Sequence, residues 1–138
     1  MNKVLKFGGA SVKNSKAIFN IKKIVSSYKD NLVIIVSAID KTTNKLEQVW
    51  GRYLEDKTKK ATEIAEELIK FHESIIEDLK LNNNPVFLKI FKALSLELLE
   101  YLVSKTKQEN NFSYSKIVSF GELWSTAIIS CYLNQEGI

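Results

Sequence analysis

The sequence predicts an α/β fold built on a parallel sheet. Three successive segments indicate it: a strand over residues 2 to 8 that ends in paired glycines, a helix over residues 15 to 28, and a strand over residues 32 to 37. Parallel strands need a crossover connection, and a helix between them supplies one with right-handed chirality. The order of the segments therefore predicts a βαβ unit.

The crossover helix is predicted from apolar residues at helical spacing, with Ser15 as the candidate N-cap. These residues are Ala17, Ile18, Ile21, Ile24, Val25 and Tyr28. The strand that follows, "LVIIVSA", is a continuous apolar and β-branched run. Such a run is typical of a strand covered on both faces, so we expect helices on both sides of the sheet.

Two long helices are predicted after the second strand. One apolar stripe runs through residues 58 to 80 and stops at the turn signal "LNNNP", and a second runs from residue 87 to about Lys107. We interpret them as a helical hairpin beside the sheet. After the connection "QENNFSYS" we expect a last helix that ends at Gly137 and carries Leu123, Ala127, Ile128 and Cys131.

Composition narrows the class of protein. The chain has 138 residues, 45% of them hydrophobic, which suits one compact domain. Arg52 is its only arginine, whereas base reading favours arginine, so we expect no nucleic-acid binding. No apolar run reaches the roughly 20 residues of a membrane span, and no secretory signal precedes the first strand. We therefore expect a cytoplasmic protein that does not bind membranes.

The sequence contains one cysteine, Cys131, and one histidine, His72. A disulfide within the chain is therefore impossible, and neither residue has the neighbours of a metal site. We expect Cys131 to pack on a buried helix face, with a reactive thiol as the alternative. We expect His72 to have a structural or surface role, so the chemistry has to come from other residues.

The segment "KFGGAS" has the residue types of a phosphate-binding turn. Gly8 and Gly9 let the backbone approach a ligand closely. Lys6 adds a positive charge, and Ser11 adds a hydroxyl near the start of the next helix. The sequence matches neither GxxxxGK[ST] nor GxGxxG. The alternative interpretation is an ordinary turn that happens to use two glycines.

Two further segments contain polar residues that are candidates for ligand binding. In "VSAIDKTTNKL", Ser37 and Thr43 follow the second strand, where open α/β sheets bind ligands. The alternative is that Thr42 to Asn44 cap a helix that begins near Lys45. In "SFGELWS", Glu122 stands among apolar residues, so its carboxylate must be solvated, paired or bound to a ligand. A surface glutamate in a first helical turn is the alternative there.

In this order, the three segments resemble the N-terminal part of aspartate kinases of the amino-acid-kinase superfamily. The resemblance spans essentially the whole chain and rests on K-F-G-G-x-S, on V-S-A followed by T-T-N-x-L, and on the S-x-G-E helix ahead of Y-L-N-x-x-G. Glutamate 5-kinase and acetylglutamate kinase share the lysine and the glycines, but not "TTNKL" after "VSA". The resemblance implies a three-layer amino-acid-kinase-like fold with the helical hairpin inserted after the second strand.

The resemblance also implies an activity, the ATP-dependent phosphorylation of the β-carboxylate of L-aspartate. This reaction begins the biosynthesis of lysine, threonine and methionine. It uses ATP and Mg²⁺, and the full-length protein is expected to be a homo-oligomer. The matched positions assign Lys6 to catalysis, Lys6, Gly8, Gly9 and Ser11 to the ATP phosphates, and Ser37, Thr43 and Glu122 to aspartate, whose ammonium group Glu122 would bind.

Two residues depart from the family pattern. Ala10 replaces a common threonine and removes a hydroxyl, and Asp40 replaces a common glycine and adds a negative charge near a phosphate site. The resemblance makes residues 1–138 the N-terminal part of a catalytic domain. Its nucleotide-binding half, a substrate-binding arginine and regulatory ACT domains would follow Ile138, so we expect the 138-residue chain alone to be inactive. The alternatives are a sister kinase for another carboxylate, or a non-catalytic domain that binds an anion or a partner.

Overall fold

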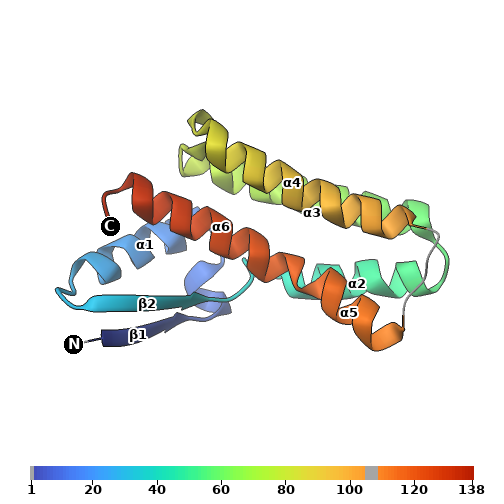
Figure 1. Cartoon of the computed structure of the whole chain (residues 1–138), viewed down its shortest axis with the longest axis horizontal. Coiled ribbons are helices and arrows are strands. Elements are labelled where there is room, and N and C mark those ends of the chain that lie inside the picture. The colour runs from blue at the N-terminus through green and yellow to red at the C-terminus, as the bar shows by residue number, and fades with distance from the viewer. Residues whose placement is uncertain (1, 105–108) are drawn as a thin grey trace.

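The chain begins with the βαβ unit that the sequence predicts (Figure 1). The computed structural model describes residues 2–104 and 109–138. In it, β1 (Asn2–Phe7) and β2 (Asn31–Val36) pair in parallel, and α1 (Ser15–Ser26) connects them. The bounds of both strands agree with the prediction to within one residue.

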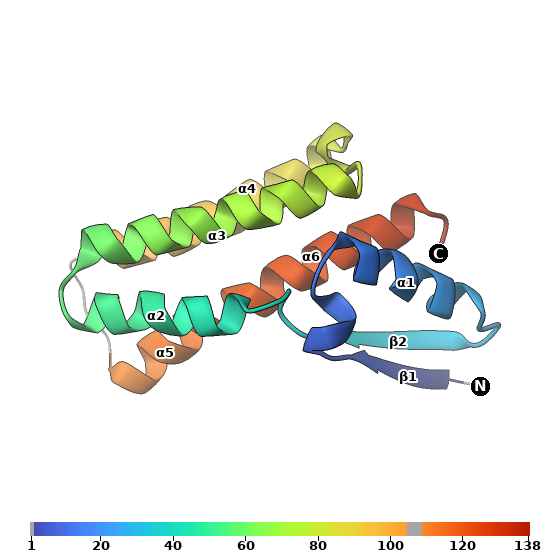
Figure 2. The same ribbon diagram turned by 180° about the vertical axis from the view of Figure 1, so that it is seen from behind.

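The rest of the described chain is mainly helical. The elements are η1 (Gly9–Val12), a 3-10 helix before α1, and then α2 (Thr42–Leu54), α3 (Thr58–Asp78), the 3-10 helix η2 (Leu81–Asn83), α4 (Pro85–Val103), α5 (Asn110–Val118) and α6 (Phe120–Gln135). α3 and α4 lie side by side as the predicted pair of long helices, and α6 runs back over the sheet (Figures 1 and 2). The predicted end of the second long helix, Lys107, lies outside the described residues.

The sheet is covered on one face. Because side chains alternate along a strand, the register that pairs Phe7 with Val36 divides the sheet into two faces. α1 and α6 lie over the face of Leu5, Phe7, Leu32, Ile34 and Val36 (Figures 1 and 2). On the other face, Val4, Val33 and Ile35 are 65%, 56% and 47% exposed. The expectation of a second strand covered on both faces is therefore wrong for the described residues, because α1 and α6 share one side.

The N-cap of α1 differs from the prediction. Asn14 holds that position, and its Oδ1 accepts a hydrogen bond from the Ala17 N–H at 2.9 Å. Ser15, the predicted cap, is the first helical residue, and its Oγ donates to Asp78 Oδ2 at 2.7 Å. Asparagine and serine are comparably good N-caps, so the sequence alone does not separate the two neighbours.

The polar connection "QENNFSYS" contains a helix that the sequence does not indicate. α5 begins at Asn110 and packs against α2. Ser113 is fully buried there, and its Oγ accepts a hydrogen bond from Trp50 Nε1 at 3.0 Å. Tyr114 adds an edge-to-face contact with the Trp50 ring, whose centroid lies 5.1 Å away. Tertiary contacts therefore stabilise a helix whose own apolar pattern is weak.

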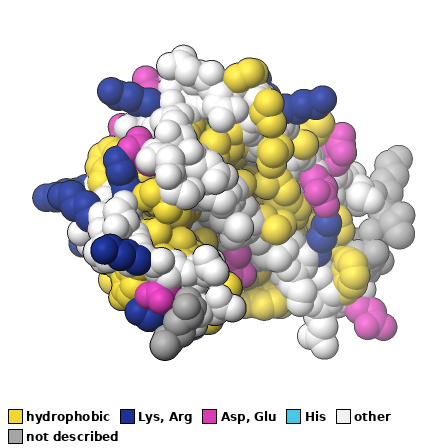
Figure 3. Space-filling view, turned by 60° about the vertical axis from the view of Figure 1, so that its left-hand side comes forward, with side chains coloured by type: hydrophobic (Ala, Val, Ile, Leu, Met, Phe, Trp, Pro, Cys, Tyr) yellow, Lys and Arg dark blue, Asp and Glu magenta, His cyan; other side chains and the backbone are white. Residues whose placement is uncertain are grey.

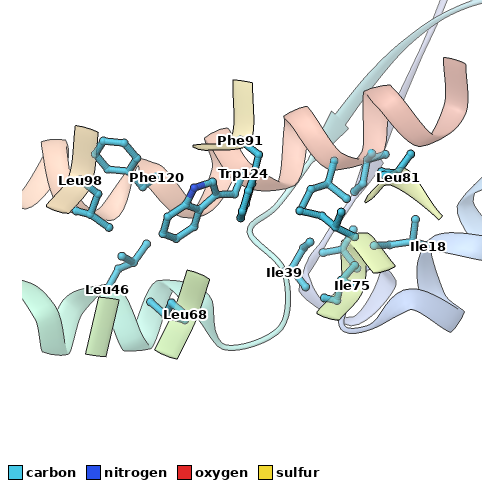
Figure 4. Close-up of a cluster of buried hydrophobic side chains, with 14 of the residues drawn as sticks. Ile18, Ile39, Leu46, Leu68, Ile75, Leu81, Phe91, Leu98, Phe120 and Trp124 are labelled. Carbon is cyan, nitrogen blue, oxygen red and sulfur yellow. The ribbon is translucent and has the colours of Figure 1, made fainter. Parts of the chain in front are cut away.

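The largest buried side chains lie where α6 crosses the long helices (Figure 4). Trp124 and Phe120 of α6 are fully buried, and Phe91 of α4 lies with its ring centroid 6.5 Å from that of Trp124. Leu46 of α2 and Leu68 of α3 complete this part of the core (Figure 4). Burial of one such side chain contributes about 1.5–3 kcal/mol, so these contacts fix the position of α6 on the rest of the chain.

The predicted end of α6 is confirmed. Gly137 has φ 79°, the left-handed conformation that favours glycine. The Gly137 N–H donates to the Asn134 carbonyl at 3.1 Å, and the Ile138 N–H donates to the Leu133 carbonyl at 3.0 Å. This pair of hydrogen bonds is the Schellman motif.

A groove of about 420 Å³ lies between β2 and α6, at the end of the molecule that carries the chain termini. Its walls include Leu32, Ile34, Ile129, Leu133 and Ile138. Hydrophobic side chains reach the surface among charged ones at this end (Figure 3). Of the helices that the structure describes, none has the length and apolar character required to traverse a bilayer.

Candidate active site

The first two candidate segments lie side by side at the carboxyl ends of the strands. The Ser37 N–H donates to the Phe7 carbonyl at 3.0 Å, one residue beyond the last paired position of β2. Gly8 and Ser37 therefore leave the sheet at the same edge. In open α/β sheets this edge is the usual ligand-binding position.

The turn after β1 leaves open space beside its glycines. A Cβ placed on Gly8 or on Gly9 would meet no other atom within 4 Å. The Ser11 N–H donates to the Gly8 carbonyl at 2.9 Å and is therefore already used within the turn. The hydroxyl of Ser11, an exposed residue, is the candidate group for contact with a ligand. Lys6 is exposed and lies on the open face of the sheet, paired with Ile35. The turn is thus accessible to an anion, as the phosphate-binding interpretation requires.

The loop after β2 enters α2 earlier than the capping alternative assumes. α2 begins at Thr42, and Lys41 holds the N-cap position without a side-chain hydrogen bond. Thr42 is 2% exposed, and its Oγ1 donates to the Ile39 carbonyl at 2.5 Å. Thr42 is therefore a structural residue. Thr43, beside it in the first helical turn, is partly exposed and is the candidate for contact with a ligand.

The backbone conformation at Asp40 explains how aspartate can replace the glycine that is common in the family. It has φ 49°, so it occupies the left-handed region that favours glycine. Aspartate is among the residues that tolerate this region best, because its short side chain can bond locally. The position therefore accepts aspartate in place of the common glycine with some strain and an added negative charge.

α6 brings the third segment to the same edge. Gly121, at the start of α6, packs so closely on the loop that a Cβ there would lie 2.9 Å from Ala38 Cβ and 3.2 Å from Thr42 Cγ2. One turn later, Ser125 Oγ donates to the Ser37 carbonyl at 2.7 Å. The loop after β2 therefore contacts both other candidate segments, the first through Phe7 and the third through Gly121 and Ser125. Sequence reasoning missed Gly121 and Ser125; their signal is small residues four apart on an otherwise apolar helix.

Glu122 lies in the first turn of α6 and is exposed. Its carboxylate is favourable beside the helix N-terminus, where the partial positive charge of the backbone N–H groups lies. Within the described part of the chain, Glu122 forms no salt bridge. This placement agrees with the surface-glutamate alternative and leaves the carboxylate accessible to a cationic group.

A hollow of about 270 Å³ adjoins the loop on the side of α3. Lys41 and Lys45 stand at its wall with Asp40, and its apolar floor comes from Ile64, Leu68 and Phe71. Neither lysine was predicted from the sequence as a site residue. They place positive charge beside the segment that carries Thr43.

The remaining reactive side chain, Cys131, is a packing residue. It is part-buried on α6, and its Sγ lies 3.4 Å from Asn84 Nδ2, the donor of a weak hydrogen bond. Burial raises the pKa of the Cys131 thiol, which lowers the thiolate fraction at neutral pH. The described residues contain no cluster of three or more His, Cys, Asp or Glu side chains suited to a metal ion. The candidate site residues described above supply charge and hydrogen-bonding groups.

Comparison with known proteins identifies the family of the chain. The sequence profile of the amino acid kinase family matches residues 1–138. The chain therefore belongs to the amino acid kinase family.

Within that family the chain is similar to aspartokinases. Aspartokinase 1, chloroplastic, of Arabidopsis thaliana is 33% identical over 140 residues, which cover 98% of this chain and 24% of that protein. The bifunctional aspartokinase/homoserine dehydrogenase 2 of Escherichia coli (strain K12) is 28% identical over 134 residues, which cover 96% of this chain and 16% of that protein. The chain thus spans about a quarter, or less, of the length of these relatives.

The fold matches a solved aspartokinase. The crystal structure of E. coli aspartokinase III in complex with aspartate and ADP (R-state) superimposes with a TM-score of 0.70 at 23% identity, covering 98% of this chain and 29% of that one. The T-state structure of the same enzyme, in complex with lysine and aspartate, matches with a TM-score of 0.72. At this identity the match establishes the fold.

Proposed function

We propose that the protein is an aspartate kinase, which transfers the γ-phosphoryl group of ATP to the β-carboxylate of L-aspartate and forms 4-phospho-L-aspartate. The observation that carries the proposal is the contact between three motif-bearing segments at the carboxyl ends of the strands. The similarity to aspartokinases supports the choice of aspartate. The reaction would begin the biosynthesis of lysine, threonine and methionine.

The phosphate side of the proposed site is the turn after β1. In the reaction, a carboxylate oxygen of aspartate attacks the γ-phosphorus, and the bond to the bridging oxygen breaks as ADP leaves. Phosphoryl transfer needs positioning and positive charge more than a covalent nucleophile. Lys6 would neutralise charge on the transferred group, and the open backbone of Gly8 and Gly9 together with the Ser11 hydroxyl would bind the phosphates.

The substrate side of the proposed site is the loop after β2 together with α6. Ser37 and Thr43 would donate hydrogen bonds to the aspartate, and the exposed carboxylate of Glu122 would pair with its ammonium group. Mg²⁺ bound together with ATP would neutralise part of the negative charge on the phosphates. The cytoplasmic location and the homo-oligomeric state stay predictions.

The proposal is tested with the full-length protein, ATP, Mg²⁺ and L-aspartate. Hydroxylamine traps an acyl phosphate as a hydroxamate, which is measured by colour and identified by mass. We expect aspartyl hydroxamate to form, with one molecule of ADP released for each molecule of hydroxamate. Turnover of glutamate or N-acetylglutamate in place of aspartate would favour the sister-kinase alternative. Absence of turnover with all three carboxylates would favour a non-catalytic binding domain.

A further inference from the structure

The close contact between α6 and the loop after β2 has a specific chemical construction. Gly121 and Ser125 are one helical turn apart and therefore face the same side of α6. Gly121 packs against the side chains of Ala38 and Thr42 without a side chain of its own. Ser125, fully buried, donates its hydroxyl to the Ser37 carbonyl at 2.7 Å. One face of α6 therefore contacts both ends of the segment from Ser37 to Thr42.

We propose that Gly121 and Ser125 are positioning residues for the phosphoryl acceptor, which hold Glu122 of α6 and the Ser37–Thr43 loop at a fixed separation. The inference rests on the proposed function and adds two residues to it. Neither residue is expected to touch the substrate. They would act through the side chains beside them.

The space at Gly121 cannot be enlarged by moving a flexible side chain. The nearest atom to an added Cβ is Ala38 Cβ, which is attached directly to the loop backbone. The next nearest belongs to Thr42, whose hydroxyl is bonded to the Ile39 carbonyl and whose side chain is buried. A methyl group at residue 121 would therefore displace the helix from the loop. Glu122, the next residue along the helix, would move with it.

Ser37 is held through both of its backbone polar groups. Its N–H donates to the Phe7 carbonyl at 3.0 Å, and its carbonyl accepts the Ser125 hydroxyl at 2.7 Å. With both peptide planes fixed, the direction of the Ser37 side chain is fixed relative to the sheet and to α6. Binding of a substrate depends on such directions, because a hydrogen bond weakens as its donor and acceptor move out of line.

The first experiment uses hydrogen exchange on the 138-residue chain and requires no substrate. Ser125→Ala removes the bond to Ser37, and Ser130→Ala is the matched control, because Ser130 is exposed on the same helix and its hydroxyl donates to the Ala127 carbonyl. We expect exchange at residues 37–42 to accelerate about tenfold in Ser125→Ala, with α3 unchanged and the control at the wild-type rate. An equal acceleration across the whole chain, or none at residues 37–42, would overturn the proposal.

The second experiment measures kinetics in the full-length protein. Gly121→Ala is compared with Gly51→Ala, a helical glycine with no atom within 4 Å of an added Cβ. We expect Gly121→Ala to raise the KM for aspartate about tenfold, with kcat and the KM for ATP within about twofold, because it weakens binding of the acceptor alone. Gly51→Ala should leave all three values unchanged. Unchanged aspartate KM in folded Gly121→Ala would overturn the inference.

A double variant separates positioning from general loss of stability. Gly121→Ala combined with Ala38→Gly moves one methyl group from the loop to the helix and restores the room between them. We expect the double variant to recover most of the lost aspartate affinity. An aspartate KM that stays as high as in Gly121→Ala would contradict the proposal. A wild-type protein that does not phosphorylate aspartate would instead reject the proposed function, and the hydrogen-exchange result would still decide whether Ser125 holds the loop.

Discussion

The imidazole ring of His72 lies against the indole ring of Trp124, with 4.8 Å between the ring centroids. His72 is fully buried on α3, and its Nδ1 lies 2.7 Å from the Leu68 carbonyl. Because a carbonyl can only accept, Nδ1 carries the proton and Nε2 has a free lone pair. Nε2 has no partner in the described part of the chain. The contact therefore fixes a neutral His72, which is a structural role and not a surface one.

His72 should make the stability of the fold depend on pH. Burial lowers its pKa from 6.5 to about 4, so the unfolded chain binds a proton below pH 6.5 that the folded chain does not. Above pH 6.5 the protonation of His72 does not reduce the free energy of unfolding. This free energy should fall by on the order of 3 kcal/mol as the pH drops to 4. Urea unfolding of wild type and His72→Phe at several pH values measures the difference. A difference that is constant over that range would contradict this account.

The strands and long helices were predictable because their signals are local. The run "LVIIV" and the apolar stripes of α3 and α4 fix an element without knowledge of the rest of the chain. α5 was not predictable, since it depends on the contact between Ser113 and Trp50, 63 residues apart. The candidate site follows the same rule. Motifs indicated Lys6 and Glu122, whereas the bond from Ser125 to Ser37 spans 88 residues, and the spacing of small residues on α6 does not identify its partner.

Asp40→Gly should stabilise the fold. The left-handed conformation at Asp40, φ 49°, strains any residue with a Cβ, and relief of that strain contributes on the order of 1 kcal/mol, partly offset by the greater entropy of glycine in the unfolded chain. Lys80→Gly is the control, because Lys80 has φ 57° and lies far along the chain from the candidate site. Both should raise Tm, and only Asp40→Gly should lower the KM for ATP. An ATP KM that changes equally in both variants would argue against a phosphate site near Asp40.

Lys6→Ala should lower kcat far more than it raises the KM for aspartate. Its charge matters most as negative charge redistributes during phosphoryl transfer, and loss of such a preorganised group typically reduces the rate by on the order of 10²–10³. Steady-state kinetics of the full-length protein measure the effect. Lys23→Ala, an exposed lysine on α1, provides the control. Near-normal turnover of Lys6→Ala would remove Lys6 from the catalytic group.

Glu122→Ala should raise the KM for aspartate more than it lowers kcat. If the carboxylate pairs with the ammonium group of aspartate, its loss weakens binding of that substrate, and kcat changes less than KM. We expect the aspartate KM to rise by about tenfold or more, since charge-assisted hydrogen bonds contribute about 1.5–3 kcal/mol. Glu73→Ala, an exposed glutamate on α3, is the matched control. An aspartate KM equal to that of the wild type would assign Glu122 to the solvent-exposed surface alone.

The 138-residue chain by itself should be catalytically silent. It spans about a quarter of the length of its aspartokinase relatives, and Lys6 lies on a sheet face where Val4 and Val33 are 65% and 56% exposed. Residues on one side of a phosphoryl-transfer site alone position the reactants poorly. Positioning accounts for much of the rate enhancement of such a site. The exposed apolar face should also promote self-association, measured by sedimentation at rising concentration. Purified chain with millimolar aspartate, ATP and Mg²⁺ should yield no hydroxamate, while the full-length protein does; comparable turnover by the two would establish that residues 1–138 form a complete site.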